Sequence, residues 1–363
     1  MRFRLAALAA SLLATTGSHA ATLPQFPPGS PWTQDITMAP TLQGAANPIP
    51  VLAGLGGFGT GNRLQIDFSF KVVNAAAGVP TRTINGYSFD DYYLPDCEPL
   101  GTPIPVPANA QIEGQPGLSC PNDPDGEDCH LLIVQGNTLY EAYKVNALSS
   151  TVFDAQCLAV WNLSYLYPEQ GRGDHCTSAD AAGFPIAPLL FNADEVFAAA
   201  QVNGDLGHAI RFILPNSRIA RDTSAANPGA VGGRLYVRPA THAGGPTGPA
   251  NTIAYGSRIR LRQDFPLTGY NAAAQVLLRT MKKYGMVLAD GGTVPLTGED
   301  DTYTTHTWPE LGISEQTFTT TAGVTLPGIA DFAVIDTGAR IPETFDCVRT
   351  VVPTGILFSN GFE

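Results

Sequence analysis

The sequence predicts a mostly β protein: a single jelly-roll or sandwich domain with about two helices and long loops. Three observations favour this class. Apolar residues alternate with a period of two in stretches such as Leu64–Val72. The 363 residues include 30 prolines and 38 glycines, which suits short strands joined by turns. No linker or fixed-period repeat is visible, so one β-rich domain is expected over residues 51–356.

Residues 1–20 have the pattern of a secretory signal peptide. Arg2 and Arg4 precede an apolar run, and Ser18-His19-Ala20 is a small-residue cleavage site. We therefore expect cleavage after Ala20 and a secreted or periplasmic protein, with a membrane anchor at 1–20 as the alternative. No later run approaches the roughly 20 apolar residues of a membrane span. We expect residues 21–50 to form an irregular N-terminal segment and residues 357–363 to form a short C-terminal tail.

The net charge and the cysteines indicate which partners and which cellular compartment are expected. Loss of the two arginines of the signal would change the formal charge from −12 to −14, which argues against nucleic acid as a partner. Six cysteines in an exported chain favour disulfides over zinc, and no Cys-x-x-Cys pair exists. The local spacing suggests Cys120 with Cys129 and Cys157 with Cys176, which leaves Cys97 for Cys347.

The remaining elements follow from turn, cap and alternation signals. Gly136-Asn137 predicts a hairpin, Asn192 caps one helix ahead of Glu195, and Asn271–Tyr284 is a second helix. Strands are expected at residues 131–134, 139–145, 158–165, 208–214, 234–237, 257–264, 286–289, 332–335 and 348–352.

Strong catalytic motifs are absent from the sequence: there is no Gly-x-Ser-x-Gly, phosphate loop, dinucleotide fingerprint or His-Glu-x-x-His. Carboxylate side chains are the first of the weaker indications of a catalytic site. Glu141 shares strand parity with apolar neighbours, which predicts a raised pKa, and Asp180 lies in a loop of small residues. The alternatives are a structural ion pair for Glu141 and a turn or cap role for Asp180.

Histidines and arginines supply the other candidates. His208 shares a strand face with Ile210 and is either a core histidine or a cleft base, and Arg211 follows on that strand. His130 and His242 stand at element ends, but no spacing demands a metal. Arg260 alternates with apolar residues between two other arginines, as in a salt-bridge ladder or a binding stripe. Trp161 and Tyr284 are core residues or platforms for sugar rings.

Several stretches resemble a group of secreted bacterial proteins that have no assigned activity. They are Cys176–Ile186, Asp194–Val196, His208–Phe212 and Lys283–Met286. The chain is also similar in general pattern to jelly-roll proteins that act on polysaccharides, a likeness of fold alone.

The leading hypothesis is a secreted glycoside hydrolase with Glu141 as acid and Asp180 as its partner. His208 is a further catalytic candidate. Substrate-binding candidates are Trp161, His130, Arg211, His242, Arg260 and Tyr284. The alternatives are a polysaccharide lyase acting on a uronate polymer and a non-catalytic glycan-binding protein. No cofactor or metal is expected, and the oligomeric state stays open.

Overall fold

The fold is described from a computed structural model covering residues 22–121, 128–350 and 352. The predicted signal peptide and the predicted tail lie outside these residues. Within them the chain forms three α-helices and sixteen short strands, so the mostly β prediction is confirmed. None of these helices has the length and apolar character that crossing a membrane would need.

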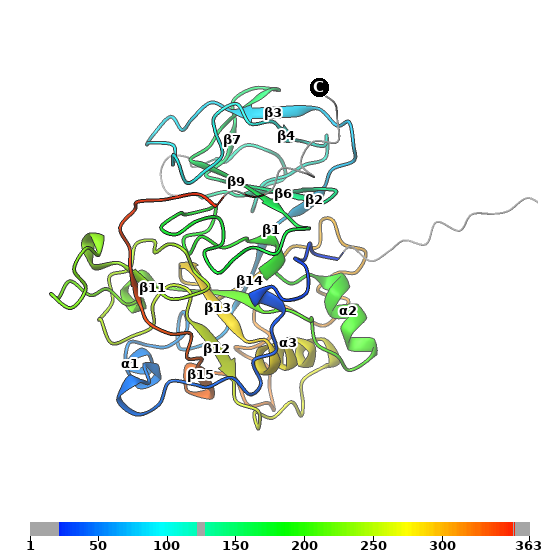
Figure 1. Cartoon of the computed structure of the whole chain (residues 1–363). Helices are drawn as coiled ribbons and strands as arrows, with labels where there is room; N and C mark the ends of the chain where they lie inside the picture. Colours follow the sequence, from blue (N-terminus) through cyan, green and yellow to red (C-terminus); the bar gives the residue numbers. More distant parts are fainter. Residues whose placement is uncertain (1–21, 122–127, 351, 353–363) are drawn as a thin grey trace, which may run out of the picture.

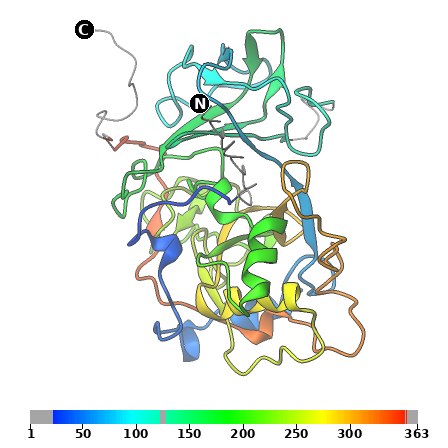
Figure 2. The same cartoon turned by 90° about the vertical axis from the view of Figure 1, so that its right-hand side faces the viewer.

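The largest sheet has six strands in the order β1-β14-β10-β13-β12-β15. The pairs β1–β14 and β10–β13 are parallel, and the other pairs are antiparallel. Helices α2 and α3 pack together beside this sheet, while α1 lies near β15 (Figures 1 and 2). The bounds are β1 Ile66–Phe70, β10 Ile210–Leu214, β12 Arg258–Leu261, β13 Met286–Gly291, β14 Leu296–Glu299, β15 Phe332–Val334, α1 Ile49–Gly54, α2 Ala193–Gln201 and α3 Ala272–Lys283.

Two four-stranded sheets lie above the large sheet in Figure 1. The nearer has the order β2-β5-β6-β9, and the outer has the order β4-β3-β8-β7. A separate pair joins β11 to β16. The bounds are β2 Val72–Asn74, β3 Thr81–Ile84, β4 Ile104–Pro105, β5 Leu131–Gln135, β6 Thr138–Tyr143, β7 Asn146–Ala147, β8 Val152–Asp154, β9 Cys157–Asn162, β11 Leu235–Tyr236 and β16 Ile341–Pro342.

The sheet β2-β5-β6-β9 is buried on both faces. Leu132, Leu139 and Trp161 belong to the main core shared with the large sheet, whereas Leu131 and Ala142 belong to a second core under the outer sheet. Successive side chains of a strand point to opposite faces, which explains this division. Glu141 has the parity of Leu139, so its carboxyl group points into the main core.

The jelly-roll topology is not confirmed, because the strands are distributed over several sheets and some pairs are parallel. Both predicted helices are present, and Asn192 caps the first as expected, while Asn271 caps the second. Asn192 Oδ1 accepts a hydrogen bond from the Glu195 amide at 2.9 Å, and Asn271 Oδ1 accepts one from Ala274 at 2.8 Å. Helix α1 was not predicted, and the strand predicted at 348–352 is wrong for residues 348–350.

Three disulfides link the six cysteines, and they correct two of the predicted pairs. Cys120–Cys129 is confirmed, but Cys97 bonds Cys157 and Cys176 bonds Cys347. The reason is that the start of β9 runs beside the 93–98 segment, where the backbone amide of Glu98 donates to the Leu158 carbonyl at 2.8 Å. The disulfides indicate an oxidising compartment, such as the periplasm or the extracellular space.

Candidate functional site

A polar cavity of about 710 Å³ lies where β10 and β13 end. Asp290 and Gly291 come from the end of β13, and Asn216 follows β10. Ligands of sheets with parallel strands bind at the carboxyl ends of those strands, which makes this edge the natural place for a site. The polar lining residues are Asp91, Asp96, Asp128, Asp180, Asp290, Tyr92, Tyr93, Tyr143, Tyr255, Thr177, Ser178, Asn216, Arg234 and His242.

One wall of the polar cavity is the loop 174–183. The Cys176–Cys347 disulfide ties it to the chain near residue 347, and Thr241 Oγ1 donates to the Cys176 carbonyl at 2.9 Å. Gly183 has φ +76°, and a Cβ there would stand 2.1 Å from Thr241 Oγ1, so only glycine fits this close approach. The loop is therefore held firmly against its neighbours.

His130 fixes the same wall from the other side. Its Nδ1 lies 2.6 Å from Glu113 Oε2 and its Nε2 lies 2.9 Å from the Ala179 carbonyl. Burial lowers the pKa of His130, but the charge and hydrogen bond of Glu113 outweigh it and raise that pKa to about 9. His130 is thus a charged donor to the backbone beside Asp180. It positions the wall and does not line the polar cavity itself.

A group of charged side chains forms the floor of the polar cavity: Asp180 and Asp290 line the cavity, and Arg211 is buried behind them. Arg211 Nη2 donates to Asp180 Oδ2 at 2.7 Å and lies 3.9 Å from Asp290 Oδ2. The Ala182 amide donates to Asp180 Oδ1 at 3.1 Å, so both oxygens of Asp180 are engaged. The side chain of Asp180 is 0% exposed, and that of Asp290 is 26% exposed.

Asp290 is the acid of this group that solvent can reach. Burial, and then the charge of Asp180, raise its pKa to about 7. The Gly291 amide donates to Oδ1 at 2.7 Å, while Oδ2 makes no hydrogen bond among the described residues and lies 3.9 Å from Arg211 Nη2. A carboxyl group with this pKa is part protonated at neutral pH, as a general acid needs to be.

His242 and Arg234 bring nitrogen groups to the opposite side. His242 Nδ1 lies 2.7 Å from the Ala181 carbonyl, which places the ring proton on Nδ1 and the lone pair on Nε2. Burial lowers the pKa of His242, so the neutral ring dominates. The Arg234 guanidinium lies 5.0 Å from the Phe345 ring centroid and has no ion-pair partner among the described residues.

Asp96 is the remaining half-buried acid of the lining. The Thr177 amide donates to its Oδ2 at 2.7 Å. Burial raises the pKa of Asp96, while the hydrogen bond from Thr177 and the nearby His242 lower it. The polar cavity therefore combines an acid that is protonated near neutrality with groups that can accept a proton.

The predicted trio of Glu141, Asp180 and His208 is not brought together. Glu141 is 0% exposed and caps the short helix Ala187–Leu189: the amides of Ile186 and Ala187 donate to Oε1 at 2.8 and 2.9 Å. Trp161 Nε1 donates to Oε2 at 2.9 Å. The raised pKa expected for Glu141 is present, at about 7 and caused by burial, but no substrate can reach the group.

His208 lines a different cavity, beside Glu195. The substrate-binding candidates are likewise divided. Arg211 lies under the floor of the polar cavity and His242 lines it, whereas Arg260 donates to the backbone carbonyls of Ile36 and Ala39. Tyr284 is 8% exposed and follows α3, so it is a core residue and not a sugar platform.

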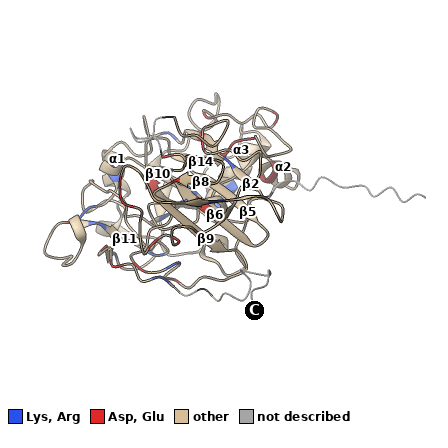
Figure 3. Ribbon diagram, turned by 90° about the horizontal axis from the view of Figure 1, so that it is seen from above, with Lys and Arg blue, Asp and Glu red and all other residues tan. Residues whose placement is uncertain are grey.

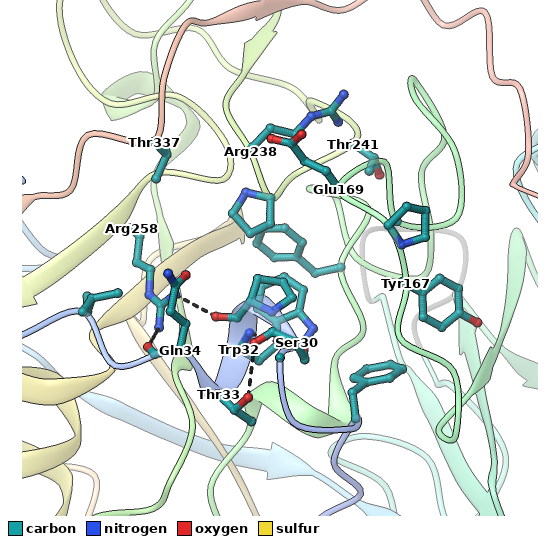
Figure 4. Close-up of a pocket in the computed structure, with 18 of the residues that line it drawn as sticks. Ser30, Trp32, Thr33, Gln34, Tyr167, Glu169, Arg238, Thr241, Arg258 and Thr337 are labelled. Carbon is teal, nitrogen blue, oxygen red and sulfur yellow. Dashed lines mark hydrogen bonds between the residues drawn. The ribbon is translucent and has the colours of Figure 1, made fainter. Parts of the chain in front are cut away.

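Figure 4 shows a third cavity, of about 720 Å³, which is lined in part by the N-terminal segment. Trp161 borders this cavity. Its indole is 3% exposed and packs edge-on against Phe26 and Tyr167, so no flat face is free for a sugar. Figure 4 shows Arg258 beside Gln34. Its guanidinium donates to the carbonyls of Pro31 and Gln34 at 2.8 and 3.0 Å. The arginine strand thus binds mainly backbone carbonyls, and only Arg262 makes the expected salt bridges.

Sequence reasoning missed Asp290, Asp96 and Arg234 as site residues. One signal was present, since Asp290-Gly291-Gly292 directly follows an apolar strand and polar residues after such strands often line sites. That β10 and β13 are parallel neighbours could not be read from the sequence.

Within the described residues, no group of three or more His, Cys, Asp or Glu side chains is arranged to hold a metal ion. Basic residues are scattered and not gathered in the view of Figure 3. Comparisons of the chain with protein families, curated proteins and solved structures find no match.

Proposed function

We propose that the protein is a secreted glycoside hydrolase whose active site is the polar cavity. The observation that carries the proposal is Asp290: an accessible carboxyl group with a pKa of about 7 at the carboxyl end of a central strand. Glycoside cleavage needs one protonated acid and one group that activates water or attacks the sugar. In this proposal Asp290 replaces Glu141 as the acid.

Asp96 and His242 are the candidates for the second role. Asp96 is half-buried, and His242 presents the lone pair of Nε2. The two groups influence each other electrostatically: the charge of Asp96 raises the pKa of His242, and His242 lowers the pKa of Asp96. A water molecule between them would lose its proton to this pair while Asp290 protonates the leaving oxygen.

The charge of the lining favours neutral or cationic sugars. Five aspartates line the polar cavity, against Arg234 as the one arginine of the lining in the described part of the chain. A polyanionic substrate would meet net repulsion there. Tyr93 and Tyr143 add aromatic surface that suits sugar rings.

The test is an assay for new reducing ends over a panel of neutral, amino and uronate polysaccharides. We expect Asp290→Asn to lower activity at least about 100-fold, the usual contribution of a general acid. Asp264→Asn is the matched control, because Asp264 is 82% exposed and paired only with Arg262. Activity of Asp290→Asn within twofold of wild type would refute this assignment. Retention on a glycan column without reducing ends would favour the non-catalytic binder.

A polysaccharide lyase is the second candidate, supported by Arg234 and His242. The unpaired guanidinium would neutralise a uronate carboxylate, and His242 Nε2 would remove the adjacent proton. Asp290 would protonate the leaving oxygen. Products that absorb in the ultraviolet as unsaturated uronates, lost in Arg234→Met but kept in Arg262→Met, would establish this reaction in place of hydrolysis.

A further inference from the structure

Away from the polar cavity, a cavity of about 690 Å³ lies between the start of the described chain and α2. Three polar atoms on its lining residues are buried without a hydrogen-bond partner among the described residues: Gln25 Oε1, Glu195 Oε2 and His208 Nε2. A buried acceptor that is left without a donor destabilises the folded state. Three of them on one cavity indicate that a ligand or a further part of the chain satisfies them.

All three atoms are hydrogen-bond acceptors. Gln25 Nε2 donates to the Pro188 carbonyl at 3.2 Å, which fixes the amide with Oε1 as the free end. His208 Nδ1 lies 2.8 Å from the Ala209 carbonyl, so the neutral ring has its proton on Nδ1 and its lone pair on Nε2. Glu195 Oε2 lies 3.9 Å from His208 Nε2, too far for a direct hydrogen bond.

The matching ligand is a primary ammonium group. It offers three N–H donors to three acceptors and one positive charge to the carboxylate of Glu195, whose side chain is 12% exposed. Aliphatic or anionic groups would leave the acceptors unsatisfied, and a neutral water molecule has only two donors.

The chain itself supplies an ammonium at this place. The Leu23 amide donates to Glu195 Oε1 at 2.9 Å, and Thr22 lines the same cavity. Cleavage after Ala20 would create an α-ammonium on Ala21, two residues before Leu23 and thus at most about 7 Å from the Leu23 nitrogen along the chain. We propose that the Glu195, His208 and Gln25 side chains form a binding site for the α-ammonium group of Ala21 in the processed chain.

This site would make the stability of the folded chain depend on cleavage after Ala20. Before cleavage, position 21 carries an uncharged peptide N–H and offers one donor; after cleavage it offers three donors and a charge. The processed chain is therefore the more stable form, and Glu195 joins the new terminus to α2 at its third residue. This inference is independent of the proposed hydrolase.

The test compares the full chain beginning at Ala21 with the same chain carrying Ser-Gly in front of Ala21. The first readout is the rate of reductive methylation of the α-amine, followed by mass spectrometry of the N-terminal peptide. An ammonium held by Glu195 has a raised pKa, and each unit lowers the reactive neutral amine about tenfold. We expect the chain beginning at Ala21 to react at least about tenfold more slowly than the extended chain.

The second readout is a thermodynamic cycle with Glu195→Gln, which keeps an acceptor for the Leu23 amide but removes the charge. We expect this change to lower Tm in the chain beginning at Ala21 and to lower it much less in the extended chain. Asp205→Asn is the matched control, because Asp205 lines the same cavity but already pairs with Lys283 at 3.2 Å. Its effect should be the same in both chains.

Equal methylation rates in the two chains would overturn the proposal. They would mean either that the three acceptors bind only water or that a protonated His208 pairs with Glu195. An equal Tm loss for Glu195→Gln in both chains would do the same. If Glu195→Gln does not fold, the methylation rates still decide, because that comparison changes no core residue.

Discussion

The carboxyl groups of Glu141 and Asp290 lie in two different regions, and both have a pKa of about 7. Glu141 lies in the middle of β6, between the sheet β2-β5-β6-β9 and the main core, with hydrogen bonds to both oxygens. Asp290 lies near the end of β13 and lines a cavity, with one oxygen bonded to an amide and the other without a hydrogen bond in the described part of the chain. Burial is the main cause of the raised pKa in both regions.

Glu141 and Asp290 together show that a raised pKa does not by itself identify a catalytic acid. Burial raises the pKa wherever it occurs, while catalysis also requires a path for the substrate. The position in the strand decides between the two outcomes here. A mid-strand carboxyl is enclosed by neighbouring layers, whereas a carboxyl at a strand end faces the loops that form cavities.

The largest effect is expected from Arg211→Met, which tests how completely the floor of the polar cavity is enclosed. Removal of the guanidinium leaves Asp180 buried without its cation, and breaking a buried pair in this way costs about 3–5 kcal/mol. Tm measured by calorimetry should fall by roughly 10 °C. Arg262→Met is the control, because that side chain is 40% exposed. A fall as small as that of the control would mean that Asp180 is as open as Asp290.

Glu141→Gln should have the next largest effect. The new amide NH₂ must face either the Trp161 indole N–H or the amides of Ile186 and Ala187, so two donors oppose each other. The expected loss is about 2–3 kcal/mol of unfolding free energy, measured by urea denaturation. Glu315→Gln, at an exposed position, should change it little. A Glu141→Gln protein with unchanged stability and no activity would restore Glu141 as the catalytic acid.

Asp290→Asn should have the smallest effect on stability, and one of opposite sign. The folded-state pKa of about 7 exceeds the ordinary aspartate pKa of 3.8, so the folded state binds more protons between those pH values and wild-type stability falls as pH rises. The neutral amide removes this loss. Tm of Asp290→Asn relative to wild type should therefore increase from pH 4 to pH 8 by a few degrees. A difference that does not vary with pH would show that Asp290 is already ionised at low pH.

The pH dependence of activity tests whether Asp290, and not Glu141, is the catalytic acid. With Asp290 as the acid, kcat/KM should decline as pH rises through about 7. Measuring the profile on the best substrate from the panel checks this, and a rate that stays constant up to pH 9 would contradict the role of Asp290.

Local signals in the sequence predicted most elements of the fold but not their assembly. The Gly136-Asn137 turn, the cap at Asn192 and the helix that starts at Asn271 depend on signals within a few residues, and all correspond to observed structure. The strand predicted from the alternation of Leu64–Val72 is divided between β1 and β2, which belong to different sheets. The parallel pairing of β10 with β13 joins residues more than seventy positions apart and leaves no local pattern. The same limit explains why two of the three predicted cysteine pairs are wrong.

The candidate site was predicted only in part. Asp180, Arg211 and His242 do gather at or under one cavity, although Asp180 is enclosed by its own ion pair. Parity correctly placed Glu141 on an apolar face, but it could not show that three donors saturate the carboxylate. Such saturation depends on Ile186 and Ala187, which belong to a different part of the chain.

The contact of Arg258 and Arg260 with the N-terminal segment has a consequence for the order of folding. These guanidiniums bind carbonyls of residues 31–39, at sequence separations of 221 to 227. In a chain made from its N-terminus, these bonds therefore cannot form until β12 has also been made, although earlier elements such as α2 already contact residues 23–32. The attachment of residues 31–39 to the edge of the large sheet is therefore completed only when the chain up to β12 is present.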